Sequence, residues 1–377
     1  MANMYDYLEW RGDLTFQEAE FNEVDSLILC WLSYVDFDGI VPEACSEFSS
    51  LTIKETAERF FATHDMDRIL NSKVSFTKTS VVLLKKLAET KRFGNLRLTG
   101  FVNRIDYEKE LQFCAMTVLL KKGLSYVVFR GTDDTLIGWK EDFNMSFLSV
   151  VPAQSKALSY LEMVANQIWG KIYVGGHSKG GNLAIYAGIR ASGRVRRRIL
   201  GIYNNDGPGF SDTKNLGAAY EEMLPKVKNY LPESAIIGVL LEPVGGFRIV
   251  KSTSKGFFQH DAMSWEVLGP HFVELEAFSA SSMMLNRVIA GWLGEISKEE
   301  RETFVDTLFR ILDATSAKSI DDLNAEKAKA AHLVLKEITG LGKETKTMLA
   351  KTLTALFKEG NLVIKESIGT PIPGKKK

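Results

Sequence analysis

A short apolar run near the middle of the chain leads into a glycine-rich turn that carries a serine. Residues 172–174 read Ile-Tyr-Val, and Gly-Gly-His-Ser-Lys-Gly-Gly follows at 175–181, before a helix-prone stretch. The pattern Gly-x-Ser-x-Gly between a strand and a helix predicts a sharp turn that exposes the hydroxyl of Ser178. Gly176 and Gly180 flank the serine because side chains there would collide where strand and helix pack closely. Any fold of this chain must accommodate that turn.

Strand and helix signals alternate on both sides of the turn. Three β-rich runs separated by turn residues predict an antiparallel meander, at residues 96–102, 111–120 and 124–129. Later β-rich runs are expected at residues 199–203, 235–241 and 247–251, with helices at 152–169 and 213–224. This alternation predicts an α/β fold with a mostly parallel central sheet flanked by helices.

The pattern divides the chain into four parts. They are a helical N-terminal segment packed on the core (1–95), the α/β core (96–282), a C-terminal helical extension (283–366) and a disordered tail (367–377). N-terminal helices are expected at residues 24–32, 54–61 and 79–90. In the extension, Ser297 and Glu300 form a capping box, and apolar stripes follow at 304–312 and 349–357.

Composition limits the partners of the protein. The 47 basic and 47 acidic residues balance, so net charge favours neither nucleic acid nor an acidic membrane. The three cysteines cannot all pair and lack metal-ligand spacing, as expected for reduced thiols. No apolar run reaches the roughly 18 residues that span a bilayer, and the first ten residues contain no apolar signal segment. We therefore expect a cytoplasmic protein without a metal, a cofactor or a transmembrane segment.

A serine nucleophile needs a general base, and histidine suits this role because it titrates near neutrality. His260 follows the last expected strand, where the base belongs if the chain order is serine, acid, histidine. His271 is the alternative. His64 and His332 lie on expected outer helices, and His177 adjoins the serine but is expected to point away from it.

The acid that orients the histidine must be a carboxylate at the C-terminal end of a strand. Glu242 directly follows the expected strand 235–241, one strand before the histidine loop, and is the first choice. Asp206 is the alternate acid, at the end of the preceding strand in Asn-Asn-Asp-Gly-Pro-Gly. Alternatively, the side chain of that aspartate has only a structural role and hydrogen-bonds the backbone of the turn.

An oxyanion hole requires two backbone N–H donors. One comes from Lys179, the residue after the serine, and the other from the loop after an earlier strand. The run 124–129 is that strand, and its exit loop contains Thr132, which could add a hydroxyl donor to its N–H.

These motifs together resemble class 3 lipases, the fungal triacylglycerol lipase type of α/β-hydrolase. The resemblance rests on Phe-Arg-Gly-Thr at 129–132, Trp139, Asp142, Gly-His-Ser-x-Gly-Gly, Phe-Phe-Gln-His at 257–260 and Trp265. The longer strings GGHSKGGNLAIYA, YNNDGPGF and QHDAMSW are similar to an uncharacterised bacterial branch of that group, found mainly in Firmicutes. The likeness covers about residues 1–270, so the C-terminal helices lie outside it.

The resemblance implies an α/β-hydrolase fold and a Ser-acid-His hydrolase. The residues that match are Ser178 as nucleophile, His260 as base, Thr132 as the oxyanion residue and Glu242 at the position of the acid. The family's acid is normally aspartate, so Asp206 stays open. Lys179 stands where these lipases usually carry an apolar residue. Its charge beside the oxyanion would favour an anionic or phosphorylated substrate.

Two functions of different classes are compatible with these residues. The first is an intracellular esterase or lipase that cleaves a small-molecule or lipid ester through an acyl-enzyme on Ser178; a thioesterase or amidase would use the same groups. The second is a non-catalytic protein of the same fold that binds or scaffolds a partner with its C-terminal helices. The presence of both Ser178 and His260 favours the enzyme.

Overall fold

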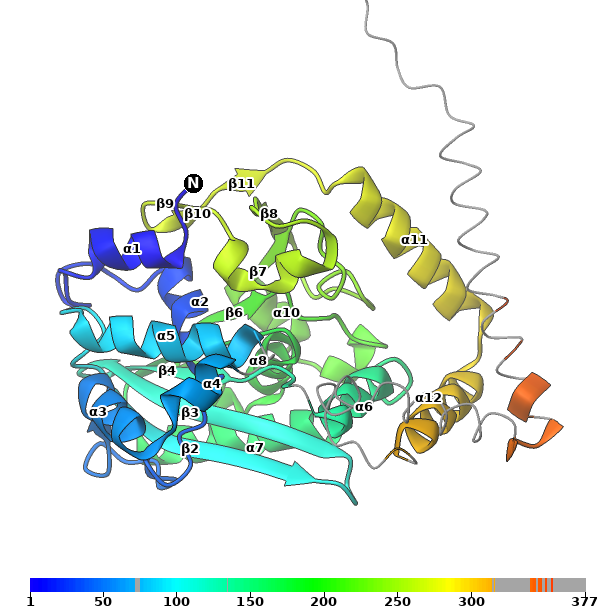
Figure 1. Ribbon diagram of the computed structural model, residues 1–377, viewed down its shortest axis with the longest axis horizontal. Coiled ribbons are helices and arrows are strands. Elements are labelled where there is room, and N and C mark those ends of the chain that lie inside the picture. The colour runs from blue at the N-terminus through cyan, green and yellow to red at the C-terminus, as the bar shows by residue number, and fades with distance from the viewer. Residues whose placement is uncertain are drawn as a thin grey trace, which may run out of the picture.

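The computed structural model describes residues 1–71, 75–133 and 135–313, with a few further positions at 315, 340–343, 345–347, 350 and 354. A nine-stranded sheet runs through the molecule, and helices cover both of its faces (Figure 1). Its strand order is β1-β2-β3-β4-β5-β6-β7-β8-β11. The expected α/β class is confirmed, and the large central sheet is mixed.

The sheet is antiparallel at its edges and parallel in its middle. The first four strands form an antiparallel array: β1 (Leu51–Thr52), β2 (Arg97–Asp106), β3 (Leu111–Lys121) and β4 (Leu124–Phe129). From β4 the pairing is parallel through β5 (Lys171–His177), β6 (Ile199–Asn205), β7 (Val227–Pro232) and β8 (Phe247–Val250). Strand β11 (Glu274–Leu275) is the edge strand of the sheet and pairs antiparallel with β8. Strands β9 (Val267–Leu268) and β10 (His271–Phe272) pair with each other in a separate two-stranded sheet. The expected meander is confirmed.

Two groups of helices cover the two faces of this sheet. One face carries α6 (Leu136–Asn144), α7 (Pro152–Gln167) and α8 (Lys179–Arg190). The other carries the N-terminal helices α1 (Met4–Arg11), α2 (Glu23–Leu32), α3 (Ile53–Thr63), α4 (Met66–Asn71) and α5 (Ser75–Glu89). Both faces are therefore buried, and β4 sends Tyr126 and Val128 into one core and Val127 and Phe129 into the other.

A buried ion pair holds the N-terminal helices together. The side chains of Asp25 on α2 and Arg92 are completely buried, and Arg92 Nε donates to Asp25 Oδ1 over 2.8 Å. The same guanidinium donates to the carbonyl groups of Leu14 and Ala19, while the Tyr7 hydroxyl donates to Asp25 Oδ1 over 2.8 Å. Burial of two charges is tolerated here because each has several partners.

The segment between β6 and β8 differs from the expectation. The predicted strand at 235–241 is wrong: these residues form turns, Leu241 has φ 66°, and β7 (Val227–Pro232) occupies the neighbouring sheet position. The predicted helix at 213–224 is also wrong as one element. Gly217, at φ 92°, separates the 3₁₀ turn Thr213–Leu216 from the short helix α10 (Tyr220–Met223). The 3₁₀ turn Leu224–Lys226 and then β7 follow.

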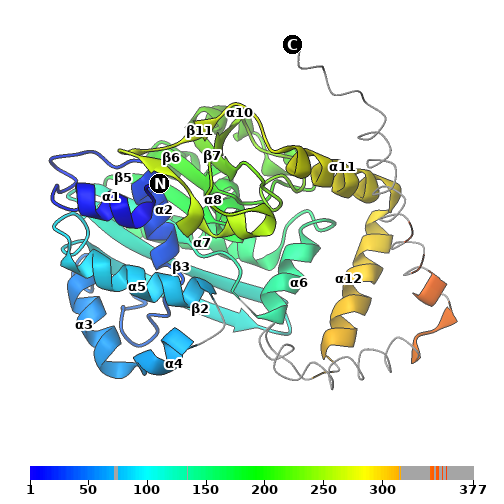
Figure 2. The same ribbon diagram turned by 45° about the horizontal axis from the view of Figure 1, so that its top comes forward.

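The C-terminal part contributes two helices at the side of the sheet, α11 (Ala280–Glu295) and α12 (Lys298–Asp313) (Figure 2). Ser297 and Glu300 bond reciprocally at the start of α12, as their spacing predicted. Val305 and Phe309 of α12 pack with Leu136 and other apolar side chains of the α6 region. The second expected stripe (Leu349, Leu353, Leu356, Phe357) and the expected tail at 367–377 lie outside the described residues.

The ion pair between Asp25 and Arg92 gives a stability prediction. Arg92→Met leaves the Asp25 carboxylate buried without its cation, so the free energy of unfolding should fall by about 3–5 kcal/mol in urea denaturation. Lys91→Met is the matched control, because Lys91 pairs with Glu18 at the surface and should cost less than about 1 kcal/mol. Equal losses in the two variants would contradict the role of this pair.

Candidate active site

Ser178 lies at the turn between β5 and α8 in a backbone conformation that non-glycine residues rarely adopt, with φ 57° and ψ −135°. Its N–H donates to the Asn205 carbonyl over 3.0 Å, and its carbonyl accepts from the Gly181 N–H over 2.9 Å. A Cβ on Gly176 would lie 2.1 Å from the carbonyl carbon of Gly180, and one on Gly180 would lie 2.1 Å from the carbonyl oxygen of Phe129. The turn therefore has no room for side chains at either glycine.

The strand register brings a carboxylate to the same edge of the sheet. His177 at the end of β5 is the register partner of Asn205 at the end of β6, so Ser178 and Asp206 follow at neighbouring positions. Asp206 is buried and uses both carboxylate oxygens. Its Oδ1 accepts from the Gly238 N–H over 3.0 Å, and its Oδ2 is 2.6 Å from Nδ1 of His260.

His260 ends a 3₁₀ turn (Gly256–His260) in the segment that follows β8. Because a carboxylate accepts, the contact with Asp206 places the hydrogen of the neutral ring on Nδ1 and its lone pair on Nε2. Burial raises the pKa of Asp206, while the hydrogen bonds from His260 and Gly238 oppose that rise. The pair thus has the orientation in which a carboxylate holds a histidine whose far nitrogen can accept a proton.

Glu242, the first choice for the acid, lies elsewhere. Its Oε2 accepts from the Thr213 N–H over 3.1 Å, and its backbone pairs with that of Phe210. The apolar run 235–241 predicts a strand that ends just before Glu242, but these residues form turns. The carboxylate that contacts His260 is Asp206. A sequence signal for it was present in the Asp-Gly-Pro-Gly turn that directly follows β6.

The turn that follows β4 lies directly against the serine. A Cβ on Gly131 would be 2.9 Å from the Cβ of Ser178. Thr132, the next residue in this turn, therefore lies close to the serine. Thr132 Oγ1 donates to Oδ2 of Asp142 on α6 over 2.5 Å. Asp142 is partly buried, and its Oδ1 atom is shielded from solvent and has no hydrogen-bond partner within the described parts of the chain. Desolvation raises the pKa of Asp142 from its ordinary 3.8 to about 6.

The ammonium group of Lys179 points into the protein. Its side chain is 1% exposed, and Nζ lies 2.9 Å from Oε2 of Glu141 and 2.6 Å from Oε1 of Gln112. The expected position of this charge beside the oxyanion is wrong, because the ammonium group pairs with Glu141 inside the protein. The other oxygen of Glu141 accepts from the Ala153 N–H over 2.8 Å, so this one carboxylate ties α6 to α7 and α8. No sequence pattern points to Glu141, because its role depends on contacts between distant segments.

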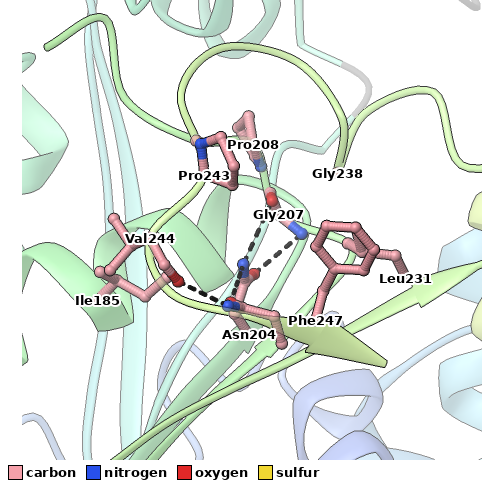
Figure 3. Close-up of a pocket in the computed structure, with 11 residues that line it drawn as sticks. Ile185, Asn204, Gly207, Pro208, Leu231, Gly238, Pro243, Val244 and Phe247 are labelled. Atoms are coloured by element: carbon pink, nitrogen blue, oxygen red, sulfur yellow. Dashed lines mark hydrogen bonds between the residues drawn. The ribbon is translucent and has the colours of Figure 1, made fainter. Parts of the chain in front are cut away.

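A small hollow lies beside the turn that follows Asp206, and Ser178 is not among the residues that line it (Figure 3). Apolar side chains line most of it, among them Leu231, Val244 and Phe247. The Asn204 carboxamide in its wall accepts from the Gly207 N–H over 2.9 Å and donates to Asn229. These bonds brace the turn that follows Asp206.

None of the helices in the described ranges is long and apolar enough to cross a bilayer. Within the same ranges, no three His, Cys, Asp or Glu side chains gather in a way that could hold a metal ion.

Comparison with known proteins gives one family match. A family model described as Mbeg1-like matches residues 87–310, which is more than half of the chain. The matched range contains Ser178, Asp206 and His260, whereas residues 1–86 lie outside it. No curated protein matches the chain.

The raised pKa of Asp142 predicts a pH-dependent stability difference. The folded protein holds this proton more tightly than the unfolded chain, so wild type loses stability from this group as the pH rises from about 4 to about 6, by on the order of 3 kcal/mol. Asp142→Asn carries no such proton, and its amide oxygen can still accept from Thr132. Its free energy of unfolding relative to wild type should therefore increase across that window and level off above it.

Urea denaturation of both proteins between pH 4 and 8 measures this difference. Comparing the two proteins at each pH cancels the contribution of every other titrating group. A difference that stays constant with pH would show that Asp142 is not desolvated in this way.

Proposed function

Because the chain belongs to the Mbeg1-like family, which is lipase-like, we propose that it is a serine hydrolase with the α/β-hydrolase fold. Its substrate is a small-molecule or lipid ester, cleaved through an acyl-enzyme on Ser178. The observation that carries this proposal is the 2.6 Å contact between His260 Nδ1 and Asp206 Oδ2, next to a serine held at φ 57°. A purely structural turn would need neither the strained serine nor the carboxylate-oriented histidine.

The chemistry follows from this arrangement. Nε2 of His260 takes the proton of the Ser178 hydroxyl as its oxygen attacks the ester carbonyl. Asp206 stabilises the imidazolium that forms, and His260 then gives the proton to the departing alcohol. Water, deprotonated by His260, then attacks the acyl-enzyme, which releases the carboxylic acid product and restores the Ser178 hydroxyl.

The oxyanion of each tetrahedral intermediate requires fixed donors. The N–H of Lys179 is at the first position of α8, where backbone donors have no partner within the helix. The N–H of Thr132 supplies the second donor from the turn beside Ser178, and Asp142 holds the Thr132 hydroxyl. One such donor contributes a factor of about 10²–10³ to kcat.

The buried pairing of Lys179 with Glu141 supports a substrate that carries no charge near the reacting carbonyl. The side chain of Lys179 does not reach the substrate side of the turn, so only its backbone takes part. A thioester or an amide would meet the same nucleophile, base and donors.

Labelling with a fluorophosphonate probe tests the proposal. Wild type should be labelled, Ser178→Ala should not, and His260→Ala should react at least about 10³-fold more slowly because its serine is not activated. Ser159→Ala, which changes an exposed serine on α7, is the control and should be labelled like wild type. Absence of labelling in folded wild type would instead support a non-catalytic binding protein.

A pair of variants tests the assignment of the acid. Asp206→Asn should lower kcat for an activated ester by about 10³–10⁴, because the carboxamide neither fixes the productive tautomer nor stabilises the imidazolium. Glu242→Gln should stay within about threefold of wild type, since Glu242 contacts the Thr213 backbone and not His260. A larger loss of kcat in Glu242→Gln than in Asp206→Asn would instead identify Glu242 as the acid.

A further inference from the structure

Tyr34, just beyond the end of α2, places its hydroxyl at the meeting point of three segments of the site. The side chain is buried, and its hydroxyl lies 2.9 Å from Nδ1 of His177, the residue before the serine. A Cβ on Gly131 would lie 2.4 Å from the same hydroxyl oxygen, 2.5 Å from the His177 carbonyl oxygen and 2.9 Å from the Ser178 Cβ. The hydroxyl therefore touches both the turn after β4 and the serine turn.

The hydrogen bonds of His177 have a definite direction. Its Nε2 lies 2.9 Å from the carbonyl oxygen of His260, and since a carbonyl only accepts, Nε2 must carry a hydrogen. Complete burial and the nearby His260 lower the pKa of His177 well below its ordinary value, so the ring is neutral. Nδ1 then holds the lone pair and accepts from the Tyr34 hydroxyl. The Tyr34 hydroxyl therefore donates to His177, and His177 donates in turn to the backbone carbonyl of His260.

Ring packing fixes the same residues. The imidazoles of His177 and His260 lie 4.6 Å apart between centroids at an angle of 37°. On another side, Trp31 of α2 packs edge-on against His177 at 5.1 Å. His177 is thus enclosed between the N-terminal segment and the histidine that contacts Asp206.

We propose that Tyr34 is a positioning residue of the active site. Its hydroxyl donates to Nδ1 of His177, whose Nε2–H bonds to the His260 carbonyl, and thereby holds the backbone of His260 and the turn at Gly131 in place against Ser178. The site then depends on a side chain from residues 1–86, outside the range that the family model matches. The role in catalysis rests on the proposed hydrolase function, whereas the hydrogen bond from Tyr34 to His177 does not.

Other groups also face the Tyr34 hydroxyl. Arg130 and Asp133 approach from the turn after β4, Cys30 from α2, and Asp142 from α6. Burial holds the pKa of the Tyr34 hydroxyl far above its ordinary value, so Tyr34 keeps its hydrogen over the pH range in which enzymes of this type work. Tyr34 is therefore a constant donor and does not act as a switch.

Tyr34→Phe, with Tyr7→Phe as its matched control, tests the proposal. Both are buried tyrosines of the N-terminal segment whose hydroxyls contact a buried side chain, and Tyr7 contacts Asp25, away from the site. Tyr34→Phe should lower kcat for an activated ester about tenfold with KM within about twofold, as expected for loss of one buried hydrogen bond that orients the base. Tyr7→Phe should leave kcat within about twofold of wild type.

Nitrogen NMR of protein with ¹⁵N-labelled histidine measures the tautomer directly and needs no turnover. In wild type the His177 signals should show a hydrogen on Nε2 and a hydrogen-bonded lone pair on Nδ1, unchanged from pH 5 to 8. In Tyr34→Phe the Nδ1 signal should lose its hydrogen-bond shift, and in Tyr7→Phe it should not.

The outcomes separate the two proposals. A hydrogen on Nδ1 of His177 in wild type, or an unchanged kcat and Nδ1 signal in Tyr34→Phe, would overturn the role of Tyr34. If the Nδ1 signal of wild type shows the hydrogen bond and Tyr34→Phe loses it, but neither wild type nor any variant turns over ester, the hydrolase function fails while the hydrogen bond from Tyr34 to His177 stands. Should Tyr34→Phe fold poorly, the wild-type spectrum alone still decides the tautomer.

Discussion

The close approach of backbone segments around Ser178 is the constraint on which the rest of the site depends. Gly176, Gly180 and the carbonyl of Phe129 leave no space for a Cβ, so β4, β5 and α8 meet at van der Waals distance. The serine accepts an unfavourable φ of 57° because backbone hydrogen bonds on both sides hold it there. This packing brings the turn at Gly131, the start of α8 and the end of β6 to one point of the sheet edge.

Buried polar side chains then orient the site residues that this backbone packing brings together. The carboxylate of Asp206 holds His260, that of Asp142 holds the Thr132 hydroxyl, and the pair of Lys179 and Glu141 ties three helices beneath the serine turn. Each of these groups is costly to bury alone and tolerable only with its partner. The arrangement is therefore specified by several coupled contacts, which keeps the site in one geometry.

The parts of the fold that depend on local pattern could be predicted from the sequence. The strand-to-helix turn at Ser178 and the antiparallel meander followed from glycine spacing and from alternating β-rich runs. The predicted position of the strand after β6 was wrong because an apolar run did not form a strand. The actual strand, β7, contains the polar residues Lys228 and Asn229, whereas the more apolar residues 235–241 form turns. The misplaced strand is the reason why the sequence favours Glu242 over Asp206 as the acid. Tyr34 could not be found from sequence, because its contact with His177 joins positions 143 residues apart.

The central claim is that Ser178 becomes acylated during turnover. Rapid mixing with a p-nitrophenyl ester, followed by acid quench and peptide mass analysis, tests it most directly. We expect a burst of about one nitrophenol per chain before the steady state and an acyl group on the peptide that carries Ser178. Turnover without a burst, or an acyl group found only on another residue, would contradict it.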